Sequence, residues 1–309
     1  MSASTAPSHG QRPSTSALAP AVHPWWQAAP LAAVFVVFFL VPLALVLMVS
    51  FWDFNEYELL PGFTWRNYFS IFEGCTQLTD NGDLCVSLST YLSTLKFTLI
   101  TWAVTLVLGF ALAYFLAFHV RSPGMQTLLF VLCTVPFWTS NVIRMISWVP
   151  LLGRNGLVNQ ALLGMNLIEP PVEWLLFSDF SVVLAFVHLY TMFMIVPIFN
   201  SMMRIDRSLL EAASDSGASG LQTLWNVIIP LSRTGIFIGS IFIITIVMGD
   251  FVTIGVMGGQ QIASIGKIIQ VQTSYLQFPL AAANAVMLLA VVLMIIWGLT
   301  RLVDIRKEL

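Results

Sequence analysis

Residues 180–203, FSVVLAFVHLYTMFMIVPIFNSMM, form a run of 24 residues without Asp, Glu, Lys or Arg. A helix needs about 20 predominantly apolar residues to cross the hydrocarbon core of a bilayer. The run therefore predicts a membrane-spanning helix, and the charged segment that follows it, beginning RIDR at residue 204, predicts where that helix leaves the membrane.

Runs of this kind recur along the 309 residues, and each is either free of charge or carries one charged residue. The predicted spans cover residues 28–52, 97–118, 125–152, 180–203, 235–257 and 280–300.

The composition agrees with six spans, because only 9% of the residues are charged and 58% are hydrophobic, whereas soluble domains carry about 25% charged residues. This excludes soluble enzymes and nucleic-acid-binding proteins, and the net charge of -2 gives no polyanion-binding signal. A membrane barrel would show short segments of alternating polarity, which are not found here. We predict an all-α polytopic membrane protein, with a transmembrane domain over residues 26–309 after a disordered cytoplasmic tail over residues 1–25.

The distribution of basic residues predicts the orientation of these spans. Eight Lys and Arg residues lie in the segments on the side of the N-terminus, and four lie in the segments on the other side. By the positive-inside rule this predicts that both termini face the cytoplasm. The first loop on the opposite side contains Cys75 and Cys85, which would form a disulfide in an oxidising periplasm or remain as two free thiols.

The loop over residues 204–234 is the long one on the predicted cytoplasmic side. Residues 209–216 favour a helix, and Gly217 permits a sharp reversal of the chain. Apolar residues then recur at helical spacing over 221–228, and Pro230 is expected to end that second helix. Two short helices meeting at a glycine would suit docking into a groove of a soluble partner, or would anchor the loop to lipid headgroups.

The spacing of Glu211, Ala212, Ala213, Gly217 and Pro230 resembles the signature loop of type I ABC importer permeases. That pattern is EAA, three residues, G, nine residues and I-x-LP, and Ile-Pro replaces Leu-Pro here. By this resemblance the ATPase-coupling residues are Glu211, Ala212, Ala213, Asp215, Gly217 and Pro230.

Three further stretches resemble the spermidine/putrescine subfamily of these permeases. They are LGFALAYFLA (108–117), PFWTSNVIRMISWVPLLGRNGLVNQ (136–160) and GDFVTIGVMGG (249–259). Ile254 replaces a proline that often follows the GDF motif, and Phe278-Pro279 replaces the usual Trp-Pro. These departures bear on the solute and not on the family.

The resemblance implies a multi-pass subunit of the bacterial cytoplasmic (inner) membrane with the type I importer permease fold. Its partners would be a homologous second permease chain, two copies of an ATP-binding subunit and a periplasmic solute-binding protein. ATP with Mg²⁺ would bind to the partner subunits, so this chain is expected to hold no cofactor or metal, to catalyse nothing and to bind no nucleic acid. The sequence contains no G-x-x-x-x-G-K-[ST] phosphate-binding loop, as this predicts.

Charged side chains inside spans usually face a cavity or pair with one another, and Arg144 and Asp250 are the two here. Asp250 could attract a cationic solute, with Trp138 or Trp148 supplying a cation–π face. Alternatively, Arg144 and Asp250 could neutralise each other or pair with the partner permease, and for Arg144 we favour such a structural role. Polar residues near Arg144 could line a wet pathway or join helices. The candidate pathway residues are Asp250, Trp138, Thr139, Asn141 and Trp148.

We expect a polyamine importer subunit, with another small amine, an opine or a phosphonate as alternative solutes. A stand-alone secondary transporter using Asp250 for a coupling ion would not explain the loop at 211–230. An intramembrane enzyme would need a nucleophile and a base at one depth, and His188 has neither an acidic nor a thiol neighbour in its own span.

Overall fold

The computed structural model describes residues 24–55, 58–73, 75 and 85–302, so the predicted disordered tail lies outside the described residues up to residue 23. The chain divides into two units, residues 1–46 and 47–309. The first unit contains α1 (Pro24–Phe35), a π-helical turn η1 (Val36–Leu40) and the beginning of α2 (Val41–Val49). Residues Ala28–Val49 form a helical run long and apolar enough to cross a membrane.

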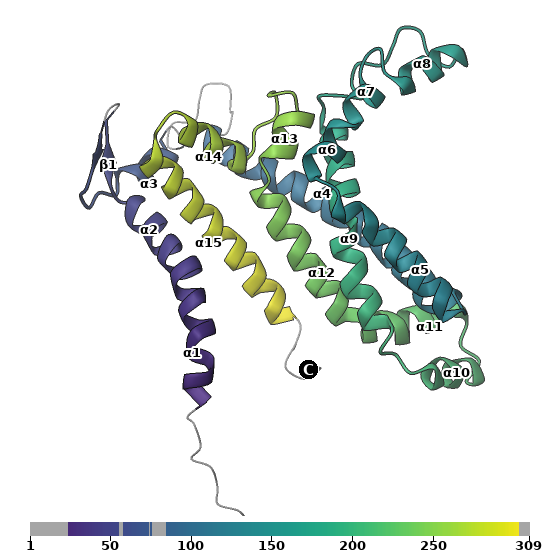
Figure 1. Ribbon diagram of the computed structural model, residues 1–309. Helices are drawn as coiled ribbons and strands as arrows, with labels where there is room; N and C mark the ends of the chain where they lie inside the picture. The colour runs from purple at the N-terminus through teal and green to yellow at the C-terminus, as the bar shows by residue number, and fades with distance from the viewer. Residues whose placement is uncertain (1–23, 56–57, 74, 76–84, 303–309) are drawn as a thin grey trace, which may run out of the picture. The chain divides into compact units, whose positions relative to one another are not determined.

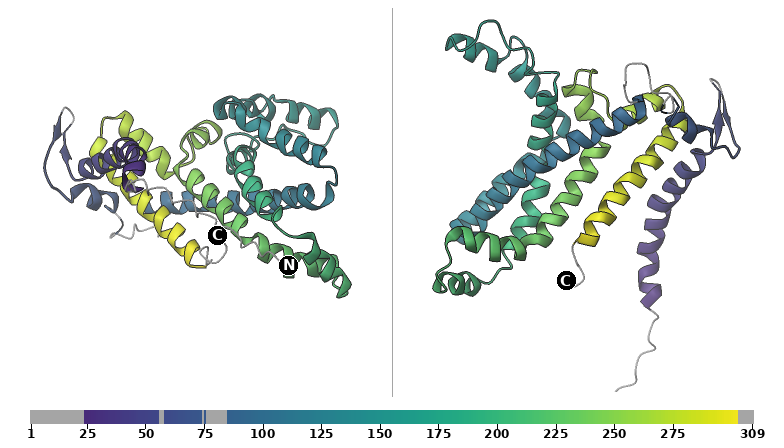
Figure 2. Two further views of the ribbon diagram at one scale, coloured as in Figure 1. Left: turned by 60° about the horizontal axis from the view of Figure 1, so that its bottom comes forward. Right: turned by 180° about the vertical axis from the view of Figure 1, so that it is seen from behind.

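Three long helices form the core of the second unit: α4 (Val86–Tyr114), α9 (Asp179–Met202) and α12 (Ile229–Gly249). They pack side by side, as Figure 1 and the rear view in Figure 2 show. Phe97, Phe186, Met194 and Ile243 are among the buried side chains between them. Five helices of the described chain are apolar and long enough to span a membrane, or six if one bent pair counts as one span.

Helix α4 begins eleven residues earlier than the predicted span 97–118 and continues through the π-helical turn η2 (Phe115–His119). Residues 86–96 contain several Ser and Thr residues, which lower the hydropathy that marks a span. Thr90, Thr94 and Thr98 are nevertheless buried, because each hydroxyl donates to the carbonyl four residues earlier. The polar residues therefore extend the helix instead of ending it.

Residues 125–152, predicted as one span, are not one straight helix. Helix α5 (Pro123–Thr134) and the 3₁₀ turn η3 (Val135–Trp138) are followed by an extended break at residues 139–140. The second half, α6 (Asn141–Ile146), α7 (Trp148–Leu152) and α8 (Leu157–Gly164), is bent by 91° from the first. Pro136 removes a backbone donor just before this break, and Figure 1 shows α7 and α8 extending away from α9.

The predicted span 235–257 also divides, because α12 ends at Gly249 and α13 (Val252–Met257) starts after it. The Asp250 carboxylate accepts from the backbone N–H of Thr253 at 2.8 Å, which satisfies a donor in the first turn of the new helix. Helix α14 (Ile265–Ser274) follows and packs on the last helix, α15 (Phe278–Leu302).

At the α14 end of the second unit lies a small substructure formed by residues 53–55 and 58–71. It contains the antiparallel strands β1 (Asp53–Phe54) and β2 (Leu59–Leu60) and the short helix α3 (Arg66–Ile71). The buried Asn67 side chain donates to the carbonyls of Ser50 and Trp52, which ties α3 to the preceding chain. A disulfide joins Cys75 to Cys85.

Two glycines of α12 allow the close approach of α9 and α12, and at Gly235 an added side chain would meet the backbone of α9. A Cβ atom at Gly235 would lie 2.4 Å from the Pro197 carbonyl oxygen, and one at Gly239 would lie 2.7 Å from the Met194 sulfur. Small residues at such crossings allow the backbones of membrane helices to pack closely.

We predict that Gly235→Ala lowers the stability of the protein by about 1–3 kcal/mol, because the backbone of Pro197 must move to admit the new methyl group. The matched control is Gly298→Ala on α15, where an added Cβ meets nothing within 4 Å. Thermal unfolding in nanodiscs should show a lower midpoint for Gly235→Ala and an unchanged or higher one for Gly298→Ala. Equal midpoints for the two variants would contradict this packing.

Candidate functional site

Helix α10 (Arg207–Asp215) projects from one end of the second unit, between α9 and the helical run that leads into α12 (Figure 1). Asp206 caps its start by accepting from the backbone N–H of Ser208 at 3.0 Å. This bond, with the Ser208 hydroxyl, holds the pKa of the Asp206 carboxyl below its usual value. Glu211, Ala212 and Asp215 are exposed on this helix, so their surface is available to another protein.

Gly217 ends α10 in a Schellman motif. Its φ of +79° lies in the left-handed region, where glycine has no steric cost. The backbone N–H of Ala218 donates to the Ala213 carbonyl at 3.0 Å, and that of Gly217 donates to the Ser214 carbonyl at 2.9 Å. Gly217 is therefore the left-handed residue that ends the helix containing Ala213. The chain reverses direction there, as predicted, because glycine can adopt this conformation.

The second helix of the loop begins directly after this turn. Ser219 and Gln222 form a capping box at the start of α11 (Gly220–Thr223), and the π-helical turn η4 (Leu224–Ile228) leads into α12. The prediction that Pro230 ends this helix is wrong, since the helical run continues from Gly220 to Gly249. The wider π turn precedes the proline, and the Ile229 N–H donates to the Leu224 carbonyl. Proline is tolerated where the helical ladder is already shifted in this way.

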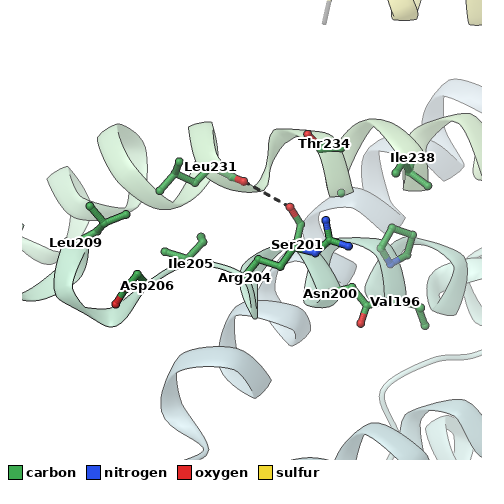
Figure 3. Close-up of a pocket in the computed structure, with 12 residues that line it drawn as sticks. Val196, Asn200, Ser201, Arg204, Ile205, Asp206, Leu209, Leu231, Thr234 and Ile238 are labelled. Atoms are coloured by element: carbon green, nitrogen blue, oxygen red, sulfur yellow. Dashed lines mark hydrogen bonds between the residues drawn. The ribbon is translucent and has the colours of Figure 1, made fainter. Parts of the chain in front are cut away.

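A cavity of about 670 Å³ lies where α9, α10 and α12 meet, and we call it the Arg204 cavity. Figure 3 shows Asn200, Ser201 and Arg204 at the end of α9, with Leu231 and Thr234 of α12 facing them. The Ser201 hydroxyl donates to the Leu231 carbonyl at 3.4 Å. Leu209 of α10 also lines the cavity, so a movement of α10 would change its shape.

A second cavity, of about 390 Å³, lies between α6, α9 and the junction of α12 with α13, and we call it the Asp250 cavity. Asn141, Tyr190, Asp250 and Thr253 supply polar groups to its lining. The Tyr190 hydroxyl donates to the Asp250 carboxylate, as does the Thr253 hydroxyl at 2.7 Å. With the Thr253 N–H, three donors orient both carboxylate oxygens, so the cavity holds a fixed negative charge beside polar donors.

Arg144 and Asp250 do not form an ion pair among the described residues. Arg144 is buried and donates to the Asn141 side-chain oxygen, while its Nε atom is buried without a hydrogen-bond partner in the described chain. Arg144 thus positions Asn141 at the rim of the Asp250 cavity, and the Asp250 charge is compensated by hydrogen bonds.

The structure brings only two of the five candidate pathway residues, Asn141 and Asp250, into this cavity. Trp138 is 85% exposed beside the break, and the Thr139 hydroxyl donates to the Pro136 carbonyl. Trp148 donates its ring N–H to His188 Nδ1 at 2.9 Å. The bend after η3 turns these side chains away, so neither tryptophan lines the Asp250 cavity.

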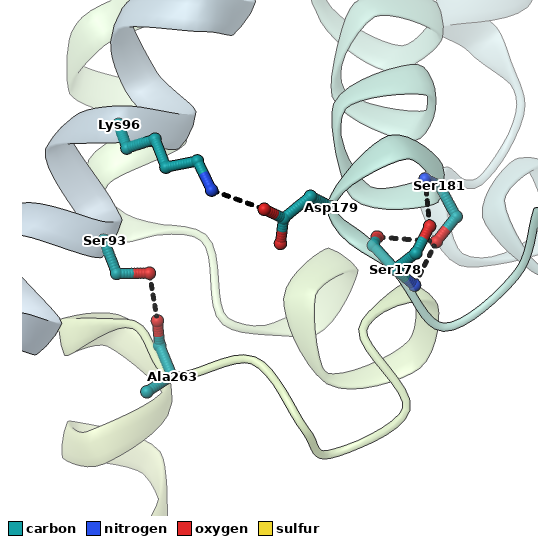
Figure 4. A network of polar contacts seen from close by, with 6 residues as sticks. All are labelled: Ser93, Lys96, Ser178, Asp179, Ser181 and Ala263. Carbon is teal, nitrogen blue, oxygen red and sulfur yellow. Dashed lines mark hydrogen bonds and ion pairs between the residues drawn. The ribbon is translucent and has the colours of Figure 1, made fainter. Parts of the chain in front are cut away.

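Polar contacts fix the helices at the end opposite α10. Figure 4 shows Lys96 of α4 paired with Asp179 at the start of α9, and the Ser93 hydroxyl donating to the Ala263 carbonyl at 3.0 Å. Ser178 and Ser181 form a capping box, and the Ser181 hydroxyl also donates to the Met257 carbonyl at 2.9 Å. These contacts join α4 and α9 to α13 and the chain that follows it.

Tyr190 and Thr253 are the site residues that the sequence analysis missed. Thr253 follows Asp250 by three residues, a spacing at which an Asp side chain can accept from a backbone N–H in the first turn of a helix, and this could have indicated the helix start there. Tyr190 is the one tyrosine in a span otherwise rich in aliphatic residues, and a buried tyrosine hydroxyl usually has a partner.

Residues 124–306 match the family described as "Binding-protein-dependent transport system inner membrane component". This match covers more than half of the chain, and the chain belongs to this family: it is the membrane-spanning permease component of a binding-protein-dependent importer.

Curated relatives in this family include the "Spermidine/putrescine transport system permease protein PotB" of Escherichia coli (strain K12). The two are 35% identical over 71% of this chain and 80% of that protein. The protein of the same name from Haemophilus influenzae is 30% identical over 75% of this chain and 77% of its own length. A bacterial alginate ABC transporter, solved with an alginate-bound periplasmic protein, contains a chain of the same fold, with a TM-score of 0.68, 16% identity and coverage of 92% and 94%.

We predict that low pH weakens the N-terminal cap of α10, which is the hydrogen bond from the Ser208 N–H to the Asp206 carboxylate. Because the pKa of Asp206 is lowered in the folded protein, its contribution is complete above the ordinary carboxyl value of about 4 and is lost as the pH falls through the lowered value. Hydrogen exchange at residues 208–212 should therefore accelerate, relative to the intrinsic rates, below about pH 4. Asp206→Asn keeps an acceptor that does not titrate, so its relative rates should stay constant; the same acid response in both proteins would contradict the assignment.

Proposed function

We propose that this chain forms, with a homologous second permease, the membrane pathway of a polyamine importer for spermidine and putrescine. The observation that carries the proposal is the 35% identity to the spermidine/putrescine permease of Escherichia coli over 80% of that protein. The Asp250 cavity supports it independently, since a fixed carboxylate suits a solute that carries ammonium groups.

The proposed topology has six spans, with the bent pair around residues 139–140 serving as the third. Both termini then lie in the cytoplasm, as the distribution of Lys and Arg favours. In this orientation α10 and the Arg204 cavity lie on the cytoplasmic side, while the Asp250 cavity and the Lys96–Asp179 pair lie toward the periplasm. The disulfide between Cys75 and Cys85 is then in an oxidising compartment.

In this proposal α10 is the coupling helix, docked into one of two ATP-binding subunits that bind and hydrolyse Mg-ATP. Its exposed residues Glu211, Ala212 and Asp215 form the docking surface, and Gly217 sets the turn that presents it. Closure of the ATP-binding subunits would favour one of two arrangements of the spans. This chain would hydrolyse nothing itself, and a periplasmic binding protein would deliver the solute.

The alternative solutes of this importer class fit the Asp250 cavity to different degrees. Another small amine would use the Asp250 carboxylate in the same way, whereas an anionic phosphonate would be repelled by it. A stand-alone secondary transporter, the other reading of the Asp250 carboxylate, does not agree with the family match and leaves the exposed surface of α10 without a role.

The test is uptake of labelled spermidine by the complete complex, obtained by co-expression with its genomic neighbours and reconstituted in vesicles with its binding protein. We expect ATP-dependent accumulation that vanadate abolishes. Vanadate-sensitive ATP hydrolysis without spermidine uptake would retain the importer and reject the solute. Uptake driven by a proton gradient without ATP would instead favour a secondary transporter.

We predict that Gly217→Asp abolishes uptake while the protein remains folded. An added Cβ at Gly217 meets nothing within 4 Å, so the substitution fits in this chain, but it strains the left-handed backbone and places a charge on the docking surface. The control is Gly124→Asp, because Gly124 is also exposed and open and lies in the first turn of α5, where a negative charge is favourable. Normal ATP-dependent uptake by Gly217→Asp would contradict the coupling role.

A further inference from the structure

A group of aromatic side chains from α9, α12 and η3 lies along these helices between the positions that line the two cavities. Along α12, Ile238 lines the Arg204 cavity and Ile246 lines the Asp250 cavity, with Phe242 midway between them. Along α9, Phe193 lies between Tyr190 of the Asp250 cavity and Val196 of the Arg204 cavity. Positions three or four apart share one face of a helix, so both phenylalanines lie on the line that connects the cavities.

Neighbouring rings in this group are in tilted or edge-on contact and are not stacked face to face. The ring centroids of Phe193 and Phe242 are 6.1 Å apart with an interplanar angle of 41°. Phe137 of η3 meets Phe193 edge-on at 5.5 Å and 80°. Phe137 is 55% exposed and Phe242 is 46% exposed, so both side chains can be reached from outside the chain.

Tyr190 connects this aromatic group to the carboxylate. Its hydroxyl donates to Asp250, and its ring centroid lies 6.2 Å from that of Phe193. A charge held at Asp250 is therefore one ring away from the Phe193–Phe242 pair. The face of an aromatic ring carries negative electrostatic potential and attracts an ammonium group.

We propose that Phe193 and Phe242 form a subsite for a second ammonium group of the solute, next to the subsite at Asp250. This inference rests on the proposed polyamine function and deepens it. A linear diamine or polyamine carries ammonium groups a few carbon atoms apart, so one can face Asp250 while the next lies over the phenylalanine rings. A monoamine can occupy one subsite only. The solute then passes from the Asp250 cavity to the Arg204 cavity along the rings.

The experiment distinguishes the electrostatic effect of the aromatic rings from the effect of apolar side-chain volume. Phe193→Leu and Phe242→Leu keep an apolar side chain but remove the ring, and Phe193→Tyr and Phe242→Tyr keep the ring. In the complete complex with its binding protein, spermidine uptake and ATP hydrolysis are measured in the same vesicles. A cation–π interaction corresponds to a roughly two- to thirtyfold effect, so we expect such a fall in spermidine moved per ATP for the Leu variants. The Tyr variants should remain close to the unmodified complex.

The matched control is Phe69→Leu, which removes a phenylalanine that is 75% exposed on α3, away from both cavities. Uptake per ATP that is unchanged in the Leu variants would overturn the subsite, as would an equal fall in the Leu and Tyr variants. A rise in passive spermidine leak without ATP in the Leu variants would assign the rings to a seal and would also overturn it. If the unmodified complex hydrolyses ATP but moves no spermidine, the proposed function fails and this inference fails with it.

Discussion

The close crossing of α9 and α12 is the contact on which the rest of the second unit depends. In a bilayer the hydrophobic effect does not drive helices together, so packing must hold them. Gly235 and Gly239 allow the α12 backbone to reach Pro197 and Met194 of α9. That crossing sets which faces of the two helices remain open, and both cavities and the aromatic group lie along those faces. A side chain at Gly235 would require the backbone of α9 to move.

The connection from α9 to α12 has both ends of α10 closed by hydrogen bonds and one irregular turn before α12. Asp206 caps the start of α10, the turn at Gly217 ends it, and Ser219 caps the helix that follows. With both ends satisfied by hydrogen bonds, α10 resists fraying and can move as a unit. The irregular part is the π turn before Pro230, and such turns are common where helices adjust during function. In the proposed coupling, a displacement of α10 would change the Arg204 cavity, because Leu209 of α10 lines it.

Hydropathy predicts the helices better than it predicts their interruptions. The charge-free run at 180–203 coincides with α9 to within one residue, because Asp179 and Arg204 flank it. The breaks at residues 139–140 and at Asp250 lie inside apolar sequence and depend on local hydrogen bonds that hydropathy does not register. Asp250 and Asn141 were identified as candidates because they are polar in apolar runs. Tyr190, Phe193 and Phe242 could be identified only from the orientation of α9 relative to α12, and the sequence pattern of a single helix does not contain that information.

The environment of Asp250 suits passage more than retention. Three donors already satisfy its oxygens, so an arriving ammonium group gains less than it would from a bare carboxylate. A pathway needs sites that are favourable enough to enter and weak enough to leave. Aromatic faces meet the same requirement, because they attract a cation without a fixed counter-charge that would hold it. In the proposed importer, a hydrogen-bonded carboxylate followed by phenylalanine rings would be a series of weak sites, and tight selection of the solute would be left to the binding protein.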